Sequence, residues 1–171
     1  MQLELAQYHE ATGFQPALPT ALDSERTAVI AFCAPHFAAS PGPLEELARA
    51  FPRSALIGCS TAGEISGTKV FDRSISVAVA RFDATRLALV TVPIAPGASS
   101  FEAGRDVARA LAAPDLRGVL ALCSGLSVNG SDLIRGINGA LDPSVRVSGG
   151  LAGDGERFQH SWVLDRGRTQ G

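Results

Sequence analysis

The best candidates for binding a small molecule lie in two segments rich in glycine and hydroxyl side chains. One is Gly58–Glu64, with the sequence GCSTAGE, and the other is Ser148–Asp154, with the sequence SGGLAGD. Both follow apolar runs that are typical of buried strands, and ligands of α/β sheets sit beyond the carboxyl ends of strands. We therefore predict a pocket between these segments. Its ligand-binding residues would be Cys59, Ser60, Thr61, Glu64, Asn129, Gly149, Gly150 and Asp154. The alternative is that the glycines serve tight turns and that Ser131 or Asp132 caps a helix.

Cysteine and histidine chemistry is the next possibility. Cys59 could act as a nucleophile, but no partner base can be placed, so a small buried cysteine is the favoured interpretation. His36 follows an apolar run, and either faces the same crevice or lies in a solvated loop. His160 stands among aromatic residues and is a candidate axial ligand of haem, although a lone histidine in such a place is more often no ligand.

Composition narrows the class of protein. The 171 residues carry 15 basic and 17 acidic side chains, a net charge of −2, with a single lysine. This excludes a basic footprint for nucleic acid. No apolar run approaches the roughly 20 residues of a membrane span, and three widely spaced cysteines do not form a disulfide framework. We expect a cytoplasmic domain with neither a nucleic-acid nor a membrane partner.

The elements that must position these residues follow from hydrophobic periodicity. We predict helices over residues 44–51, 99–112 and 131–141. Buried strands are expected over 27–34, 54–59, 118–124 and 145–148, the first covered on both faces. Further strands are expected as an edge strand within 1–11, as a hairpin of 74–82 with 87–93, and over 161–164, followed by a turn at 165–167. Residues 12–25 should be loop.

The two halves of the chain resemble each other. Val29 aligns with Val119, Leu47 with Ile137 and Ile57 with Val147, a constant offset of 90 residues. We predict an α/β fold of two pseudo-repeated strand-helix-strand-strand units packed as one layered domain over residues 1–171. The second unit has no long counterpart of 74–82, which suggests a missing strand or a sheet completed by another chain, for example in a homodimer.

In combination, these motifs resemble the N-terminal region of the FIST domain family. The resemblance runs over nearly the whole chain and is carried by Gly58–Ile65, Leu126–Gly130, Val147–Asp154, Arg157-Phe158 and Trp162-Val163. It implies an intracellular sensory domain that binds a small ligand and reports to a histidine kinase or a cyclic-di-GMP enzyme. Full FIST proteins have a further C-terminal domain, which this chain is expected to lack. One bacterial branch resembling this sequence is described as haem-binding and nitric-oxide-sensing, which would make haem a cofactor.

The sequence thus supports three functions. The first is a sensory domain without catalytic activity, with its ligand between the two glycine-rich segments. The second is an enzyme that uses Cys59 or Thr61 as a nucleophile. The third is a protein interaction module that binds no small ligand.

Overall fold

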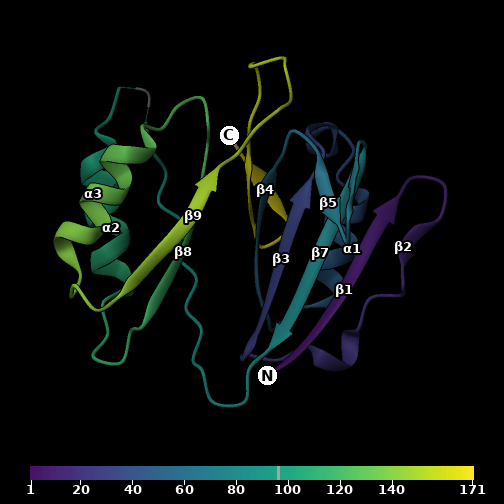
Figure 1. Ribbon diagram of the computed structural model, residues 1–171, viewed down its shortest axis with the longest axis horizontal. Helices are drawn as coiled ribbons and strands as arrows, with labels where there is room; N and C mark the ends of the chain where they lie inside the picture. The colour runs from purple at the N-terminus through teal and green to yellow at the C-terminus, as the bar shows by residue number, and fades with distance from the viewer. Residues whose placement is uncertain (96) are drawn as a thin grey trace. The chain divides into compact units, whose positions relative to one another are not determined.

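The computed structural model describes residues 1–95 and 97–171 and divides them into two units (Figure 1). The large unit comprises residues 1–87 and 152–171, and the small unit comprises residues 88–151. Each unit contains both helix and strand, so the predicted mixed α/β class is confirmed.

A seven-stranded mixed sheet forms the framework of the large unit. Its strands are β1 (Gln2–His9), β2 (Gly13–Gln15), β3 (Thr27–Cys33), β4 (Ala55–Ser60), β7 (Ser74–Arg81), β10 (Val163–Asp165) and β11 (Arg168–Gln170). They are ordered β11-β10-β4-β3-β7-β1-β2, with β3 and β4 parallel and the other neighbours antiparallel. A separate hairpin pairs β5 (Glu64–Ser66) with β6 (Lys69–Phe71).

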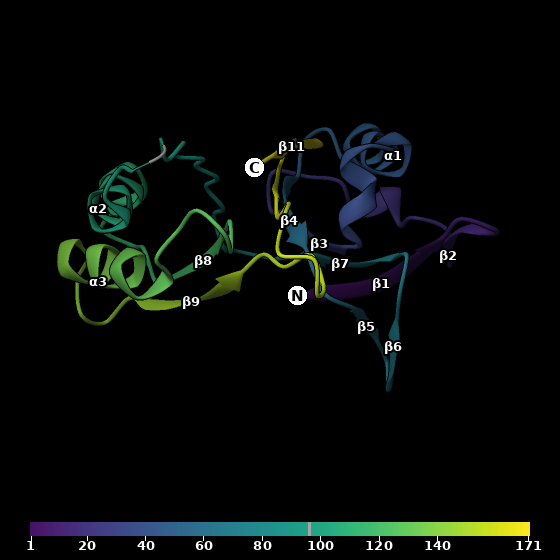
Figure 2. The ribbon, with the colours of Figure 1, turned by 90° about the horizontal axis from the view of Figure 1, so that it is seen from above.

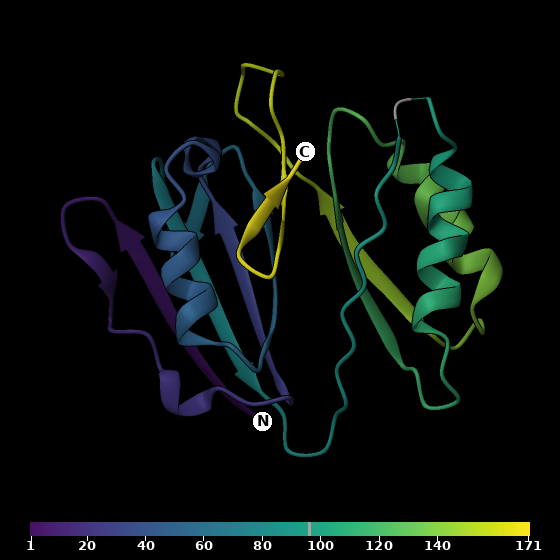
Figure 3. The same cartoon turned by 180° about the vertical axis from the view of Figure 1, so that it is seen from behind.

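A helical layer covers one face of this sheet. It consists of α1 (Gly42–Ala50) and two short 3₁₀ helices, Thr20–Leu22 and Pro35–Ala38, whose apolar side chains enter the same core as those of the strands. Figures 2 and 3 show α1 lying against one side of the strands. Val29, Ala31 and Cys33 point into this core, whereas Phe32 on the opposite face is 38% exposed. The prediction that this strand is covered on both faces is therefore wrong, because the helices pack on one side only of the strand's alternating side chains.

The sheet order explains where the other strand predictions fail. Residues 87–93 form no strand, because β7 already pairs with β3 on one side and β1 on the other, leaving no edge for a hairpin partner. The predicted edge strand, β1, lies one place inside the edge, since β2 pairs with Gln7–His9. The predicted turn at 165–167 is confirmed as the link of the β10–β11 hairpin, with Arg166 and Gly167 at positive φ.

The small unit packs two helices, α2 (Ser100–Leu111) and α3 (Gly130–Ala140), with a parallel pair of strands, β8 (Gly118–Cys123) and β9 (Arg146–Leu151). Ser99 caps α2, because its hydroxyl accepts a hydrogen bond from the Glu102 amide. Asn129 caps α3 by accepting from the Asp132 amide, so neither Ser131 nor Asp132 is the cap.

The arrangement is compatible with the predicted repeat, since β3-α1-β4 and β8-α3-β9 both join parallel strands through a helix. In each, a glycine in the second strand lies against an alanine of the first: Gly58 opposite Ala31, and Gly149 opposite Ala121. The alanines are 90 residues apart and the glycines 91. The constant offset of 90 residues therefore does not extend into the second strand, where the second copy has one additional residue. The last strand predicted for the second copy, over 161–164, corresponds to β10, which pairs with β4 in the large unit.

Close packing of α2 on α3 depends on two glycines. A Cβ added to Gly104 would lie 2.2 Å from the Leu133 carbonyl oxygen, and one added to Gly136 would lie 2.1 Å from that of Phe101. These distances are far below van der Waals contact, so the two helix backbones can approach this closely only where glycine stands.

We predict that Gly136→Ala destabilises the protein by about 1–3 kcal/mol, because the added methyl forces the helices apart. The matched control is Gly139→Ala on the same helix, where an added Cβ meets no atom within 4 Å. That variant should be stabilised by about 0.5–1 kcal/mol through the higher helix propensity of alanine. Denaturant unfolding of both variants checks this, and equal effects at the two positions would contradict it.

Candidate functional site

The end of β4 is fastened to the segment that follows residue 152. The Ser60 amide donates to the Trp162 carbonyl at 2.9 Å, and the Ser60 hydroxyl accepts from the Trp162 amide at 3.0 Å. The Ser60 carbonyl accepts from the Gly153 amide at 2.9 Å. The indole Nε1 of Trp162 in turn donates to the Pro35 carbonyl at 2.9 Å. Ser60 thus links the end of β4 to the backbone that leads into His36.

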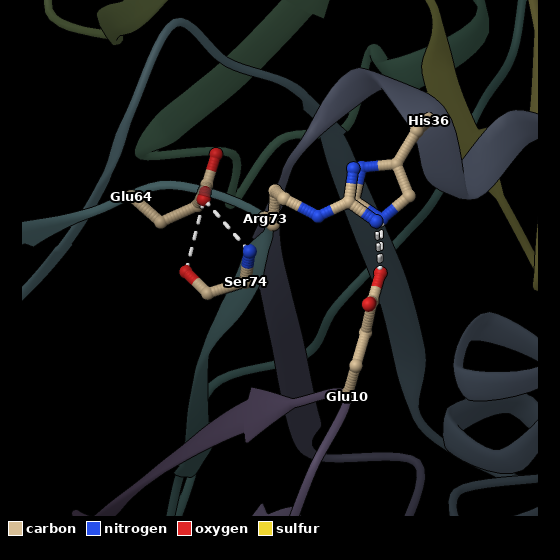
Figure 4. A network of polar contacts seen from close by, with 5 residues as sticks. All are labelled: Glu10, His36, Glu64, Arg73 and Ser74. Atoms are coloured by element: carbon tan, nitrogen blue, oxygen red, sulfur yellow. Dashed lines mark hydrogen bonds and ion pairs between the residues drawn. The ribbon is translucent and has the colours of Figure 1, made fainter.

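A buried carboxylate lies four residues further along. Glu64 is 1% exposed, and its Oε1 accepts from the Thr61 hydroxyl at 2.8 Å. Its Oε2 accepts from the Ser74 amide at 3.1 Å and from the Ser74 hydroxyl at 2.9 Å (Figure 4). Among the described residues no cationic side chain pairs with Glu64. Three donated hydrogen bonds therefore offset the cost of burying this carboxylate and join the β4 loop to the start of β7.

A second set of charged side chains lies beside this carboxylate and nearer to solvent (Figure 4). Glu10 Oε1 accepts a hydrogen bond from Arg73 Nη2 at 2.7 Å, and it is also hydrogen-bonded to His36 Nε2 at 3.0 Å. We call Glu10, His36 and Arg73 the outer cluster. Arg73 is 65% exposed and has φ +57°, a left-handed conformation that is uncommon outside glycine and often marks a functional position. The His36 ring packs on Phe37, with ring centroids 4.2 Å apart.

The outer cluster and the buried carboxylate share one stretch of backbone. Arg73 holds Glu10, and the next residue, Ser74, donates twice to Glu64. The Ser74 carbonyl also accepts from the Ala34 amide at 3.0 Å, two residues before His36. Ser74 thus connects the backbone beside Arg73 with the backbone that leads into His36.

Asp154 serves its own loop. Its Oδ1 accepts from the Phe158 amide at 2.9 Å, and its Oδ2 accepts from the amides of Gln159 and His160 at 2.7 and 2.9 Å. These backbone hydrogen bonds, that of His160 foremost, hold the pKa of Asp154 below its ordinary value. The negative charge thus fixes the loop from 154 to 160.

The structure brings some of the predicted site residues together. Ser60, Thr61, Glu64 and Asp154 all lie in the large unit, and their polar atoms make the intramolecular hydrogen bonds described above. Cys59 is 3% exposed. The remaining three belong to the small unit: Asn129 caps α3, while Gly149 and Gly150 lie within β9. A pocket shared by all of these residues stays a prediction.

Sequence reasoning missed most of the outer cluster. Glu10 and Arg73, like the neighbouring Ser74, belong to segments without a motif. Their only signal is that β1 ends where β7 begins, which requires the antiparallel pairing of His9 with Ser74. For His36, the sequence allows two placements, one facing the crevice and one in a solvated loop. Its side chain is partly exposed and bonded to Glu10, so it takes part in a defined polar cluster.

Cys33 and Cys59 are buried in the structure, and Cys123 is partly buried. Burial raises the pKa of Cys33 well above its ordinary value, and the neighbouring Cys59 and Glu64 raise it further. Burial likewise raises the pKa of Cys123. A raised pKa keeps a thiol protonated at neutral pH and therefore weakly nucleophilic.

The surroundings of His160 do not fit haem. His160 and the five residues before it are exposed, and Phe158, the aromatic residue in this loop, is 75% exposed. Haem needs an apolar enclosure over its faces, which this loop does not supply. Across residues 1–95 and 97–171, no group of three or more histidine, cysteine, aspartate or glutamate side chains is placed to hold a metal ion.

No helix in the described part of the chain combines the length and apolar character that crossing a membrane requires.

We predict that the stabilising effect of Asp154 depends on pH. A carboxylate with a lowered native pKa contributes fully above the ordinary aspartate pKa of about 3.9. That contribution disappears as the pH falls through the lower native pKa. Asp154→Asn should therefore be less stable than the wild type at neutral pH, and the difference should shrink below about pH 4. Urea unfolding from acidic to neutral pH measures this, and a difference that grows towards acid would contradict the assignment.

Comparison with known proteins finds one matching family. The model of one family, the FIST N domain, matches residues 27–171, a range that includes β3, β4, β7 and the buried Glu64. No curated protein and no solved structure matches the chain.

Proposed function

The chain belongs to the FIST N domain family, which consists of sensory domains of signal transduction, and from this premise we propose that it is a noncatalytic receptor for a small organic anion. The proposed binding site is the outer cluster at the carboxyl end of β3. The ligand carries a carboxylate that replaces Glu10 on Arg73 and His36.

One observation carries this proposal: two nitrogen-bearing side chains, Arg73 and His36, converge on a single oxygen of Glu10 at a partly exposed position. A guanidinium offers five N–H donors in a planar fork that matches a carboxylate. Glu10 uses only one Arg73 nitrogen and is itself half exposed. A free carboxylate that engages the fork with both oxygens would compete with it.

The same geometry suggests how occupancy is reported. A ligand shifts a conformational equilibrium only when it binds one arrangement better than another. Here a new partner for Arg73 would act on Ser74, and through it on Glu64 and the β4 loop. We propose that this change reaches a histidine kinase or a cyclic-di-GMP enzyme in the cytoplasm.

We propose a noncatalytic role because the described cysteines of the large unit have no features of an activated nucleophile. Cys33 is fully buried with a raised pKa, and Cys59 is 3% exposed. A cysteine nucleophile needs a thiolate and an adjacent base. The hydroxyl groups of Thr61 and Ser74, beside the outer cluster, donate to the buried Glu64.

We predict that small carboxylates raise the thermal stability of the protein, with Glu10→Gln increasing the effect and Arg73→Gln abolishing it. Removing the Glu10 charge frees the two nitrogens for the ligand, whereas removing the guanidinium removes the main donor. Acetate, succinate and glutarate are suitable probes in a thermal-shift titration. A ligand at 100 times its Kd should add about 2.7 kcal/mol to the free energy of unfolding.

The matched controls are Glu46→Gln and Arg49→Gln, which change the same charges at exposed positions of α1. Both should respond like the wild type. A response that survives in Arg73→Gln, or its absence from the wild type for all three carboxylates, would refute the proposed ligand class.

A further inference from the structure

A cleft of about 460 Å³ lies at the opposite end of the sheet from the outer cluster. It forms where β3 and β4 begin and where β7 ends, and Arg26, Arg53, Arg81 and Phe82 are among its lining residues. Its volume falls within the range of pockets that bind small molecules. The three arginines are 27 and 28 positions apart in the sequence, so only the register of the strands brings them together.

The three guanidinium groups differ in the contacts that they make within the protein. Arg26 Nη1 donates to the backbone carbonyl of Asp83 at 2.6 Å. Arg53 Nη2 lies 3.8 Å from Glu25 in a pair whose side chains are both largely exposed, an interaction worth little in water. The Arg81 side chain makes no hydrogen bond or ion pair with any other described residue, although its backbone pairs with β1 and β3. Most of the donors in the cleft are thus available to a ligand.

The acidic groups nearby do not cancel these charges. Asp83 is bound by the Met1 ammonium at 2.6 Å, and this contact, with the nearby Arg81, lowers its pKa. Asp23 accepts from the Arg53 amide and the Ser54 hydroxyl, at 3.1 and 2.6 Å. Glu25 remains as the exposed partner of Arg53. The cleft is therefore locally positive in a chain whose net charge is −2.

We propose that this cleft binds a phosphate ester of nucleotide size. Arginine is the side chain best suited to phosphate, because its planar fork donates two parallel hydrogen bonds to adjacent oxygens. Three such groups outnumber the two carboxylates that also line the cleft, Glu25 and Asp83, so the cleft attracts the negative charge of a phosphate monoester. The partly buried ring of Phe82 in the wall offers an apolar surface for the rest of the molecule.

The cleft is separate from the outer cluster. Arg26 precedes the first residue of β3 and His36 follows its last. Arg73 precedes the first residue of β7, and Arg81 is its last. Strands of this length span roughly 20 Å. The proposal therefore stands on observations that the outer cluster does not share, and it does not rest on the proposed sensing of carboxylates.

Isothermal titration calorimetry of the full chain with AMP, and with adenosine as the uncharged comparison, tests this at low salt. We expect AMP to bind and adenosine not to bind. Arg81→Gln should weaken AMP binding at least about tenfold, the loss expected for a charge-assisted contact. Because the Arg81 side chain makes no hydrogen bond or ion pair to described residues, this variant should keep the melting temperature of the wild type. Arg53→Gln gives a second variant of the same cleft with the same expected loss.

The matched control is Arg168→Gln on β11, an exposed arginine outside the cleft. It changes the net charge equally and should leave AMP affinity unchanged. Three results would overturn the proposal: no AMP binding by the wild type, equal binding of adenosine, or an equal loss in Arg81→Gln and Arg168→Gln. Loss of AMP binding in Arg73→Gln but not in Arg81→Gln would also overturn it, because it would place the phosphate in the outer cluster.

Discussion

The burial of one carboxylate is the constraint on which the carboxyl edge of the large sheet depends. Glu64 is almost inaccessible to water and has no cationic partner among the described residues, so it must be satisfied by donors that the fold holds in place. Those donors come from Thr61, just after β4, and from Ser74, the first residue of β7. Meeting this demand fixes both segments, and with them Arg73, whose left-handed backbone presents its side chain to Glu10.

The mixed sheet places different chemistry at its two ends. Because β3 is parallel to β4 and antiparallel to β7, the last residues of β3 and β4 lie at the same end of the sheet as the first residues of β7. The buried carboxylate and the outer cluster lie at that end. The first residues of β3 and β4 and the last residues of β7 lie at the opposite end, together with three arginines. The two ends of the same strands therefore carry side chains of different chemistry.

Local sequence signals predicted the elements well, and longer-range geometry explains what they missed. Periodicity located α2, and the apolar runs located β3, β4 and β8. The predicted strand over 87–93 is wrong, because the pairing of β7 on both sides is a property of the whole sheet. The glycine-rich motifs drew attention to Ser60, Thr61 and Glu64, which the fold does bring together. Arg73 and Arg81 lie in no motif, and only strand register gives them neighbours.

The most direct test of this account is the stability of Glu64→Gln against Glu46→Gln in denaturant unfolding. The amide keeps the size of the side chain but replaces one acceptor oxygen with a donor, which then faces a hydroxyl or amide donor. We predict a loss of about 1–3 kcal/mol for Glu64→Gln. At the exposed Glu46, the change should stay within about 0.5 kcal/mol. Equal stability of the two variants would contradict the claim that the buried carboxylate holds this edge of the sheet together.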